Sequence, residues 1–299
     1  MPSGILLLDK PLGLSSNAAL QRVRRLFKGE KAGHAGALDP LATGMLPICL
    51  GEATKIAGDI VAGAKLYRFT IALGRRTATG DAEGEVTVEA AVPALTRERV
   101  ETALAGFRGP RMQVPPMYSA LKQGGEPLYR LARSGKTVER AARAIELYEV
   151  KLLALEAGSL EVETSCTKGT YVRVLAEEIA AALGTVGHVS ALRRLEVEPF
   201  GAEPMQTLES LERCCAAGKA APLLPADYPL QHLPSVRLTA ADAARLRKGQ
   251  AVPAVLPGSE HGLADGAPRL RLYDEAGRFL GVGVAAGAAT VRPRRLLNI

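Results

Sequence analysis

Residues 33–47 read Gly-His-Ala-Gly-Ala-Leu-Asp-Pro-Leu-Ala-Thr-Gly-Met-Leu-Pro and gather special backbone residues around one imidazole, His34, and one carboxylate, Asp39. Glycine lets a backbone approach a ligand closely, and Pro40 restrains Asp39 to extended geometry, which holds its carboxylate in place. Taken alone, an Asp-Pro pair is usually a turn, and a single histidine usually makes a structural hydrogen bond. The segment is therefore a candidate site that the rest of the chain must support.

The wider region, residues 31–55, fits no single element, because four glycines and two prolines interrupt both the helical and the strand periodicity. Its apolar residues, which include Leu41, Met45 and Ile48, argue against disorder. We expect a structured loop here. Long loops inside a compact domain are more often functional than decorative, which strengthens the case for a site.

The chain is basic: its 299 residues include 38 Lys and Arg against 31 Asp and Glu, for a net charge of +7. Such a balance is typical of proteins that bind phosphates, although many basic proteins bind no nucleic acid. The basic residues also cluster, at Arg22, Arg24, Arg25, Lys28 and Lys31 and again at Arg292, Arg294 and Arg295. RNA and DNA are therefore candidate partners.

Cysteine usage and the N-terminus point to one compartment. The four cysteines show neither zinc-type pairing nor a dense disulfide framework, which fits a reducing environment. The apolar run at residues 5–8 ends at Asp9 and is too short for the core of a signal peptide or for a membrane span. We expect a cytoplasmic protein with no membrane attachment.

Regular elements flank the loop. Residues 5–8 predict a buried strand, and the helix that follows is capped by Ser15, Ser16 or Asn17 and ends at Gly29. One face of this helix carries arginines, so we expect it to form a wall of an RNA groove. Periodicity predicts further strands at 67–73, 86–88, 145–155 and 159–166, and helices at 97–107 and 172–183.

The composition of the sequence changes from about residue 222, because four prolines occur within the 13 positions from 222 to 234. Thr239 and Asp242 predict the start of a short helix, and a hairpin is expected around residues 275–277. Clustered prolines and a change to short strands are typical of a domain boundary. We expect two units, residues 1–232 and 233–299.

Residues 33–47 resemble the signature loop of the bacterial TruB-type tRNA pseudouridine-55 synthases, with its Gly-His-x-Gly-x-Leu-Asp-Pro-Leu-Ala-Thr-Gly core. Ala35 departs from the family, which usually has Thr there, and this removes a hydroxyl beside the site. Five further blocks match in family order: Asp9-Lys10-Pro11; Lys65-x-Tyr67 with Leu73-Gly74 and Thr77-x-Thr79-x-Asp81; Gln113-x-Pro115-Pro116-x-Tyr118-Ser119-Ala120-Leu121-Lys122; Lys168-Gly169-Thr170-Tyr171-x-Arg173; and Leu192-Arg193-Arg194.

The resemblance implies an α+β catalytic domain, the pseudouridine synthase fold with a mixed, largely antiparallel sheet, followed by a small PUA-like β domain that binds RNA. It implies conversion of uridine 55 in the T-loop of tRNA to pseudouridine, with the T arm of tRNA as partner and no obligate protein partner, so a monomer is compatible. The isomerisation exchanges no electrons, and the sequence has no dinucleotide or metal motif, so we expect neither cofactor nor metal.

The resemblance makes Asp39, Tyr67 and Arg173 the catalytic set. Arg173 matches the arginine that pairs with the family's catalytic aspartate, and an adjacent guanidinium favours the ionised carboxylate. Without the match, Arg173 would be a surface charge of a helix. The carboxylate is suited to attack the sugar or the pyrimidine, or to remove a sugar proton, and the sequence does not choose among these routes.

The remaining predicted roles concern the target base, which must leave its stack. By resemblance Tyr67 stacks on the uracil, Tyr171 and Leu192 line its pocket, and His34 meets the RNA where the base has left. Without the match, Tyr67 and Leu192 would be core residues of a strand and of a helix end. Two alternatives stay open: the same chemistry on another RNA, and a tRNA-binding folding factor whose catalysis is incidental.

Overall fold

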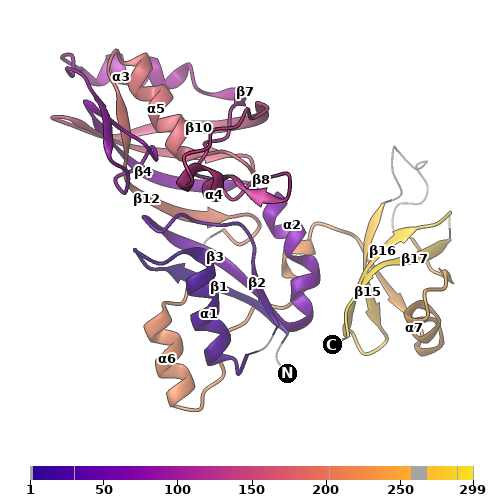
Figure 1. The fold of residues 1–299 in the computed structure, drawn as a ribbon. Coiled ribbons are helices and arrows are strands. Elements are labelled where there is room, and N and C mark those ends of the chain that lie inside the picture. The colour runs from indigo at the N-terminus through magenta and orange to yellow at the C-terminus, as the bar shows by residue number, and fades with distance from the viewer. Residues whose placement is uncertain (1–2, 30, 202, 257–267, 288, 299) are drawn as a thin grey trace.

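A computed structural model of the chain describes residues 3–29, 31–201, 203–256, 268–287 and 289–298. Two large sheets organise these residues, one built from residues 4–197 and the other from residues 235–296 (Figure 1). Among the described residues, no helix is long and apolar enough to cross a membrane.

The larger sheet has eight strands, and among the described residues only one of its pairings, between β3 and β12, is parallel. This confirms the predicted mixed, largely antiparallel sheet. In spatial order its strands are β1 (Gly4–Lys10), β3 (Ala42–Leu50), β12 (Gly187–Val197), β4 (Lys65–Leu73), β11 (Ser159–Cys166), β10 (Arg143–Glu156) and β7 (Gly109–Gln113), with β2 (Ala32–His34) added beside β3.

The sheet is buried on both faces near its first strands. In β1, Leu6 and Leu8 join a core shared with four helices, whereas Ile5 and Leu7 join a second apolar cluster on the opposite face. Successive side chains of a strand point to opposite faces, so the unbroken apolar run of β1 reflects burial on both sides. The four helices are α1 (Ser16–Leu26), α3 (Arg97–Ala105), α5 (Val172–Ala182) and α6 (Leu208–Ala216).

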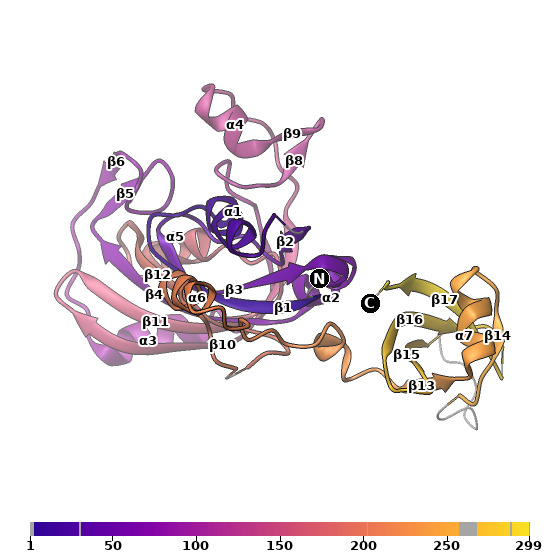
Figure 2. The same cartoon turned by 90° about the horizontal axis from the view of Figure 1, so that it is seen from below.

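Shorter elements connect these strands and helices. One group of them, β8, β9 and α4, projects from the body of the sheet (Figure 2). The shorter elements are η1 (Gly51–Ile56), α2 (Ala57–Ala62), β5 (Arg75–Thr77), β6 (Val86–Glu89), β8 (Lys122–Gln123), β9 (Glu126–Pro127), α4 (Leu128–Arg133) and η2 (Tyr228–Leu230).

The prediction of a loop over residues 31–55 is wrong, because β2, β3 and η1 occupy most of this region. Gly44 lies inside β3 with φ of 98°, at a point where a Cβ atom would stand 2.1 Å from the carbonyl oxygen of Arg194. Pro47 lies between the part of β3 that pairs with β12 and the part that pairs with β2, so its missing N–H breaks neither ladder. Both residues permit the strand at these positions, although they are usually strand breakers.

The position assigned to Leu192 is also corrected. Leu192 lies within β12, opposite Phe69 of β4, and not at the end of a helix. The preceding helix α5 ends at Ala182, and Gly184 has φ of 85°, which fits the predicted glycine stop. The strand was missed because β12 carries several charged residues that hide its alternation.

The second sheet forms a separate β unit with its own apolar core. The hairpin around residues 275–277 is confirmed. Contacts with the larger unit include Lys55 Nζ, which donates to the Leu296 carbonyl oxygen at 2.9 Å, and the ion pair of Arg269 with Asp59 at 2.6 Å. The elements of this unit, in sheet order, are β13 (Ser235–Leu238), β15 (Arg269–Asp274), β16 (Phe279–Ala285), β17 (Thr290–Leu296) and β14 (Val252–Pro253), with α7 (Ala240–Arg247) packed against them.

Candidate active site

Asp39 lies in the connection between β2 and β3, and both neighbouring residues are held by hydrogen bonds. The Leu38 backbone N–H donates to the Ser16 hydroxyl at 2.7 Å, and this hydroxyl donates to the Leu38 carbonyl at 2.9 Å. On the other side, Lys10 Nζ and the Gly13 N–H both donate to the Pro40 carbonyl, at 3.4 Å and 2.9 Å. These bonds fix the backbone from which the Asp39 carboxylate extends.

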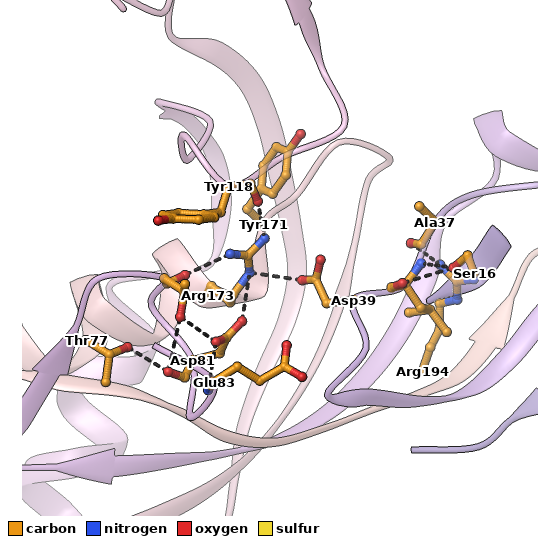
Figure 3. A network of polar contacts seen from close by, with 12 residues as sticks. Ser16, Ala37, Asp39, Thr77, Asp81, Glu83, Tyr118, Tyr171, Arg173 and Arg194 are labelled. Carbon is orange, nitrogen blue, oxygen red and sulfur yellow. Dashed lines mark hydrogen bonds and ion pairs between the residues drawn. The ribbon is translucent and has the colours of Figure 1, made fainter. Parts of the chain in front are cut away.

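Arg173, in the first turn of α5, forms an ion pair with Asp39. Its Nε lies 2.9 Å from Asp39 Oδ2 and 3.7 Å from Oδ2 of the buried Asp81 (Figure 3). Its two terminal nitrogens donate to the carbonyls of Thr79 and Tyr118, at 2.7 Å and 2.6 Å. The Arg173 side chain is only 6% exposed, so these four contacts hold the guanidinium in one orientation.

The environment of Asp39 opposes its ionisation on balance. Burial raises the pKa of this carboxyl above its ordinary value of 3.8, Arg173 acts in the opposite direction, and the neighbouring Asp81 carboxylate raises the pKa further. The Asp39 side chain nevertheless keeps 41% of its surface exposed, because it faces an open cavity. A carboxylate with a raised pKa in a cleft is more basic than one in water and is a candidate for catalysis.

The cavity in front of Asp39 has a volume of about 370 Å³. Five of the six predicted site residues line it: Asp39, Tyr67, Tyr171, Arg173 and Leu192. Tyr67 and Leu192 come from the adjacent strands β4 and β12. Tyr171 caps α5 and is held by Gln113, whose Oε1 accepts from the Tyr171 N–H at 2.8 Å. The site is thus assembled from four separate parts of the sequence.

His34 is the predicted site residue that does not line this cavity. It is the last residue of β2 and is partly buried. Its Nδ1 atom is buried and has no hydrogen-bond partner among the described residues. Burial and the Arg194 guanidinium both lower the pKa of His34, which favours the neutral ring.

Three polar residues of the site received no role from sequence reasoning, namely Lys65, Asp81 and Arg194. Each is buried, and Lys65 and Arg194 line the cavity. All three fall within the matched blocks, so the sequence offered a signal that they matter without indicating what they contact. Among the described residues, no group of three His, Cys, Asp or Glu side chains is arranged to hold a metal ion.

Comparison with known proteins places the chain in a family. A family model described as TruB family pseudouridylate synthase (N terminal domain) matches residues 24–172. The tRNA pseudouridine synthase B of Chromohalobacter salexigens is 51% identical over 295 residues, which cover 99% of this chain and 94% of that relative. The chain belongs to the TruB family. Two further models, of a tRNA pseudouridylate synthase B C-terminal domain and of a pseudouridine synthase II TruB C-terminus, match residues 173–231 and 234–297.

A second relative and two solved structures are also similar to this TruB family member. The tRNA pseudouridine synthase B of Hydrogenovibrio crunogenus is 46% identical over 297 residues, covering 99% of this chain and 94% of the relative. Among solved structures, the Cbf5–Nop10–Gar1 complex contains a chain with a TM-score of 0.71 and 22% identity, covering 97% of this chain and 84% of that one. The Nop10–Cbf5 complex of an archaeal box H/ACA sRNP gives a TM-score of 0.70 and 20% identity, with 98% and 85% coverage. The predicted pseudouridine synthase fold is therefore confirmed.

Proposed function

We propose that this chain is a tRNA pseudouridine synthase that isomerises uridine 55 in the T-loop of tRNA. The observation that carries the proposal is the Asp39–Arg173 ion pair, 2.9 Å long, at a cavity lined by Tyr67, Tyr171 and Leu192 in a member of the TruB family. Relatives up to 51% identical that bear the name tRNA pseudouridine synthase B support tRNA as the substrate.

The reaction breaks the C1′–N1 bond of uridine, turns the uracil without releasing it, and forms a C1′–C5 bond. Asp39 is the catalytic carboxylate in this proposal, acting on the sugar or the base or removing a sugar proton. Arg173 lowers the pKa of Asp39 and so favours the ionised carboxylate, acting against the larger effect of desolvation, and the ion pair orients the carboxylate at the cavity. Proton transfer and covalent bond exchange account for the whole isomerisation, so side chains are sufficient for it.

The cavity accommodates a uracil that has left its stack. Unstacking a base costs a few kcal/mol, which contacts in the pocket must offset. Tyr67 supplies an aromatic face for the base, while Tyr171 and Leu192 form the walls. His34 lies outside this cavity and is only partly buried, and we assign it to contact the RNA from which the base has moved.

The two sheets suggest a division of labour. We assign residues 1–232 to catalysis and residues 233–299 to RNA binding, as a PUA-like domain. The C-terminal arginine cluster, Arg292, Arg294 and Arg295, is exposed and suited to contact phosphates. Two of its members line a groove of about 440 Å³ with Lys55 and Arg269. Because the proposed substrate is tRNA, we also assign the protein to the cytoplasm, and we propose that it acts as a monomer without an obligate protein partner.

A map of pseudouridine tests this assignment. Unmodified tRNA transcripts are incubated with the purified protein, and pseudouridine is located by chemical labelling and reverse transcription. We expect one modified position, 55, and the same modification in an isolated T-arm hairpin. Modification only at other positions, or only in another RNA, would overturn the substrate assignment.

A further inference from the structure

Arg194 is a buried cation next to the cavity. The residue is 1% exposed, and among the described residues no carboxylate oxygen lies within 4.0 Å of its guanidinium. By contrast, Arg173 pairs with Asp39, and the neighbouring Arg193 pairs with Asp9 at 2.8 Å. Burial of an uncompensated charge is costly, so the position of Arg194 calls for an explanation.

The hydrogen bonds of Arg194 explain why a long side chain with several donors lies here, but they do not require a positive charge. Its Nε donates to the Met45 carbonyl at 2.7 Å, and its terminal nitrogens donate to the carbonyls of Gly36 and Ala37, at 3.1 Å and 3.5 Å. Figure 3 shows Arg194 beside Ala37. These bonds link both sides of the segment that carries Asp39. They use three of the five N–H groups of a guanidinium. Neutral donors would hold the same carbonyls without a buried charge.

The position of Arg194 relative to the base pocket suggests a use for that charge. Arg194 in β12 lies directly opposite Tyr67 in β4, and Leu192 lies two residues before it in the same strand. Directly opposed residues, and residues two apart in a strand, share one face of a sheet. Accordingly, all three residues line the cavity. A uracil stacked on Tyr67 would therefore lie beside the guanidinium.

The positive field of Arg194 reaches the groups around the cavity. Burial lowers the pKa of Lys65 to about 8, and Arg194 contributes to this shift. Burial raises the pKa of the Tyr67 hydroxyl, whereas Arg194 lowers it. The contribution of Arg194 therefore disfavours cations and favours anions at this wall of the cavity, although burial outweighs it at the Tyr67 hydroxyl, whose pKa is raised on balance.

The reaction creates a negative charge when Asp39 attacks the sugar, because a carboxylate oxygen of Asp39 then bonds to C1′ as the C1′–N1 bond breaks. The electron pair of the broken C1′–N1 bond stays with uracil, which becomes an anion delocalised over N1 and the two carbonyl oxygens. C5 of this anion then attacks C1′ and releases Asp39 as a carboxylate, and transfer of the C5 proton through solvent to N1 yields pseudouridine. Negative charge thus leaves Asp39, beside Arg173, and appears on the base.

We propose that Arg194 is a catalytic residue whose guanidinium stabilises the uracil anion between cleavage of the C1′–N1 bond and formation of the C1′–C5 bond. The inference rests on the proposed function and on Asp39 acting at the sugar. Preorganised groups aimed at developing charge make large contributions to catalysis. Arg193, on the same strand but paired with Asp9, has no equivalent role.

The test compares two leaving groups under single-turnover conditions with excess enzyme. T-arm hairpins carry uridine or 5-fluorouridine at the target position, and the loss of the starting nucleoside is followed in nuclease digests by mass spectrometry. Fluorine withdraws electrons and makes the uracil anion more stable by itself. The variants are Arg194→Met, which removes the charge, and Arg194→Lys, which keeps the charge but cannot hold three carbonyls.

We expect Arg194→Met to slow uridine cleavage about 100-fold, or about 2.7 kcal/mol, and to slow 5-fluorouridine cleavage at least tenfold less. Arg194→Lys should stay within about tenfold of the unaltered protein on both hairpins. Equal losses on both hairpins in folded Arg194→Met, or an Arg194→Lys loss as large as that of Arg194→Met, would overturn the proposal in favour of a purely structural clamp.

Melting temperatures of the variants separate a lost fold from a lost charge. If Arg194→Met does not fold, the lysine variant decides: rates near those of the unaltered protein support the charge, and a 100-fold loss on both hairpins refutes it. The unaltered protein on the uridine hairpin is the control for the proposed function. Failure to convert uridine there would refute that function, whereas conversion with equal losses in the variants refutes only the role of Arg194.

Discussion

Replacing Asp39 and replacing Arg173, the two partners of one ion pair, should change the stability of the folded protein in opposite directions. In Asp39→Asn, Arg173 keeps its contacts with Asp81 and with two backbone carbonyls. The cost of desolvating the Asp39 carboxylate is removed. Because the Asp39 side chain is 41% exposed, the gain is limited to about 0–1 kcal/mol, or a rise in Tm of up to about 4 °C. In Arg173→Met, the buried Asp81 loses its cation, which costs about 3 kcal/mol, or about 6–12 °C.

The effect of Asp39→Asn should depend on pH in a defined direction. The pKa of Asp39 is raised in the folded protein, so the folded state binds its proton more tightly than the unfolded chain does. The contribution of Asp39 to the stability of the unaltered protein therefore falls as pH rises from about 3.8 through the raised pKa, whereas asparagine does not titrate. The stability advantage of Asp39→Asn should grow with pH over this window and then stay constant.

The assay is thermal unfolding of the unaltered protein and the two variants between pH 4 and pH 8, with catalytic rates measured on the same samples. Both variants should lose activity, but only Arg173→Met should lose stability. An Asp39→Asn variant that melts as low as Arg173→Met would refute the reasoning. A stability difference between Asp39→Asn and the unaltered protein that shrinks with rising pH would refute it as well.

Three other variants test separate parts of the account. Tyr67→Leu should reduce the single-turnover rate at least about 100-fold by removing the stacking face, while leucine at the exposed Tyr148 should leave it unchanged; rapid-quench kinetics decide this. Gly44→Ala should destabilise the protein by more than about 3 kcal/mol in urea titrations, because its Cβ would lie 2.1 Å from a backbone oxygen and its φ is 98°, whereas Gly58→Ala, in open space, should not. Replacing all three arginines of the C-terminal arginine cluster with glutamine should weaken tRNA binding and reduce the slope of log K against log salt by about 2–3 in filter-binding curves. Single-turnover rates at saturating enzyme should stay within a few-fold. An unchanged slope would contradict the assigned RNA contact.

The periodicity of the sequence was sufficient to predict an element where the residues of that segment alone determine its structure. The alternation in β4 and the apolar stripe of α5 predicted both elements, and Gly158 at φ of 82° joins β10 and β11 as expected. For β3 the sequence wrongly predicted a loop, because the structural roles of Gly44 and Pro47 depend on the strands beside them. Gly44 admits the backbone of β12, and Pro47 falls where no strand needs its N–H. Such tertiary reasons leave no trace in a single segment.

The site follows the same division. No spacing rule joins Asp39 to Arg173, and their pairing was expected only through resemblance to a family. Lys65 and Arg194 look like surface charges in the sequence, and only the sheet shows that they are buried beside the cavity. The matched blocks therefore indicated candidate residues that line the cavity, while burial and hydrogen bonding reveal which of the described charges are paired.

The most direct test of the central claim measures pseudouridine formation in an isolated T-arm hairpin, in chelator-treated buffer, with the unaltered protein and with Asp39→Asn. The account predicts complete conversion at position 55 by excess unaltered protein. It predicts no detectable pseudouridine with the folded asparagine variant, whose affinity for the hairpin stays within about tenfold, or about 1.4 kcal/mol. Substantial pseudouridine formation by folded Asp39→Asn, or chelator-sensitive activity of the unaltered protein on a hairpin that remains folded, would contradict it.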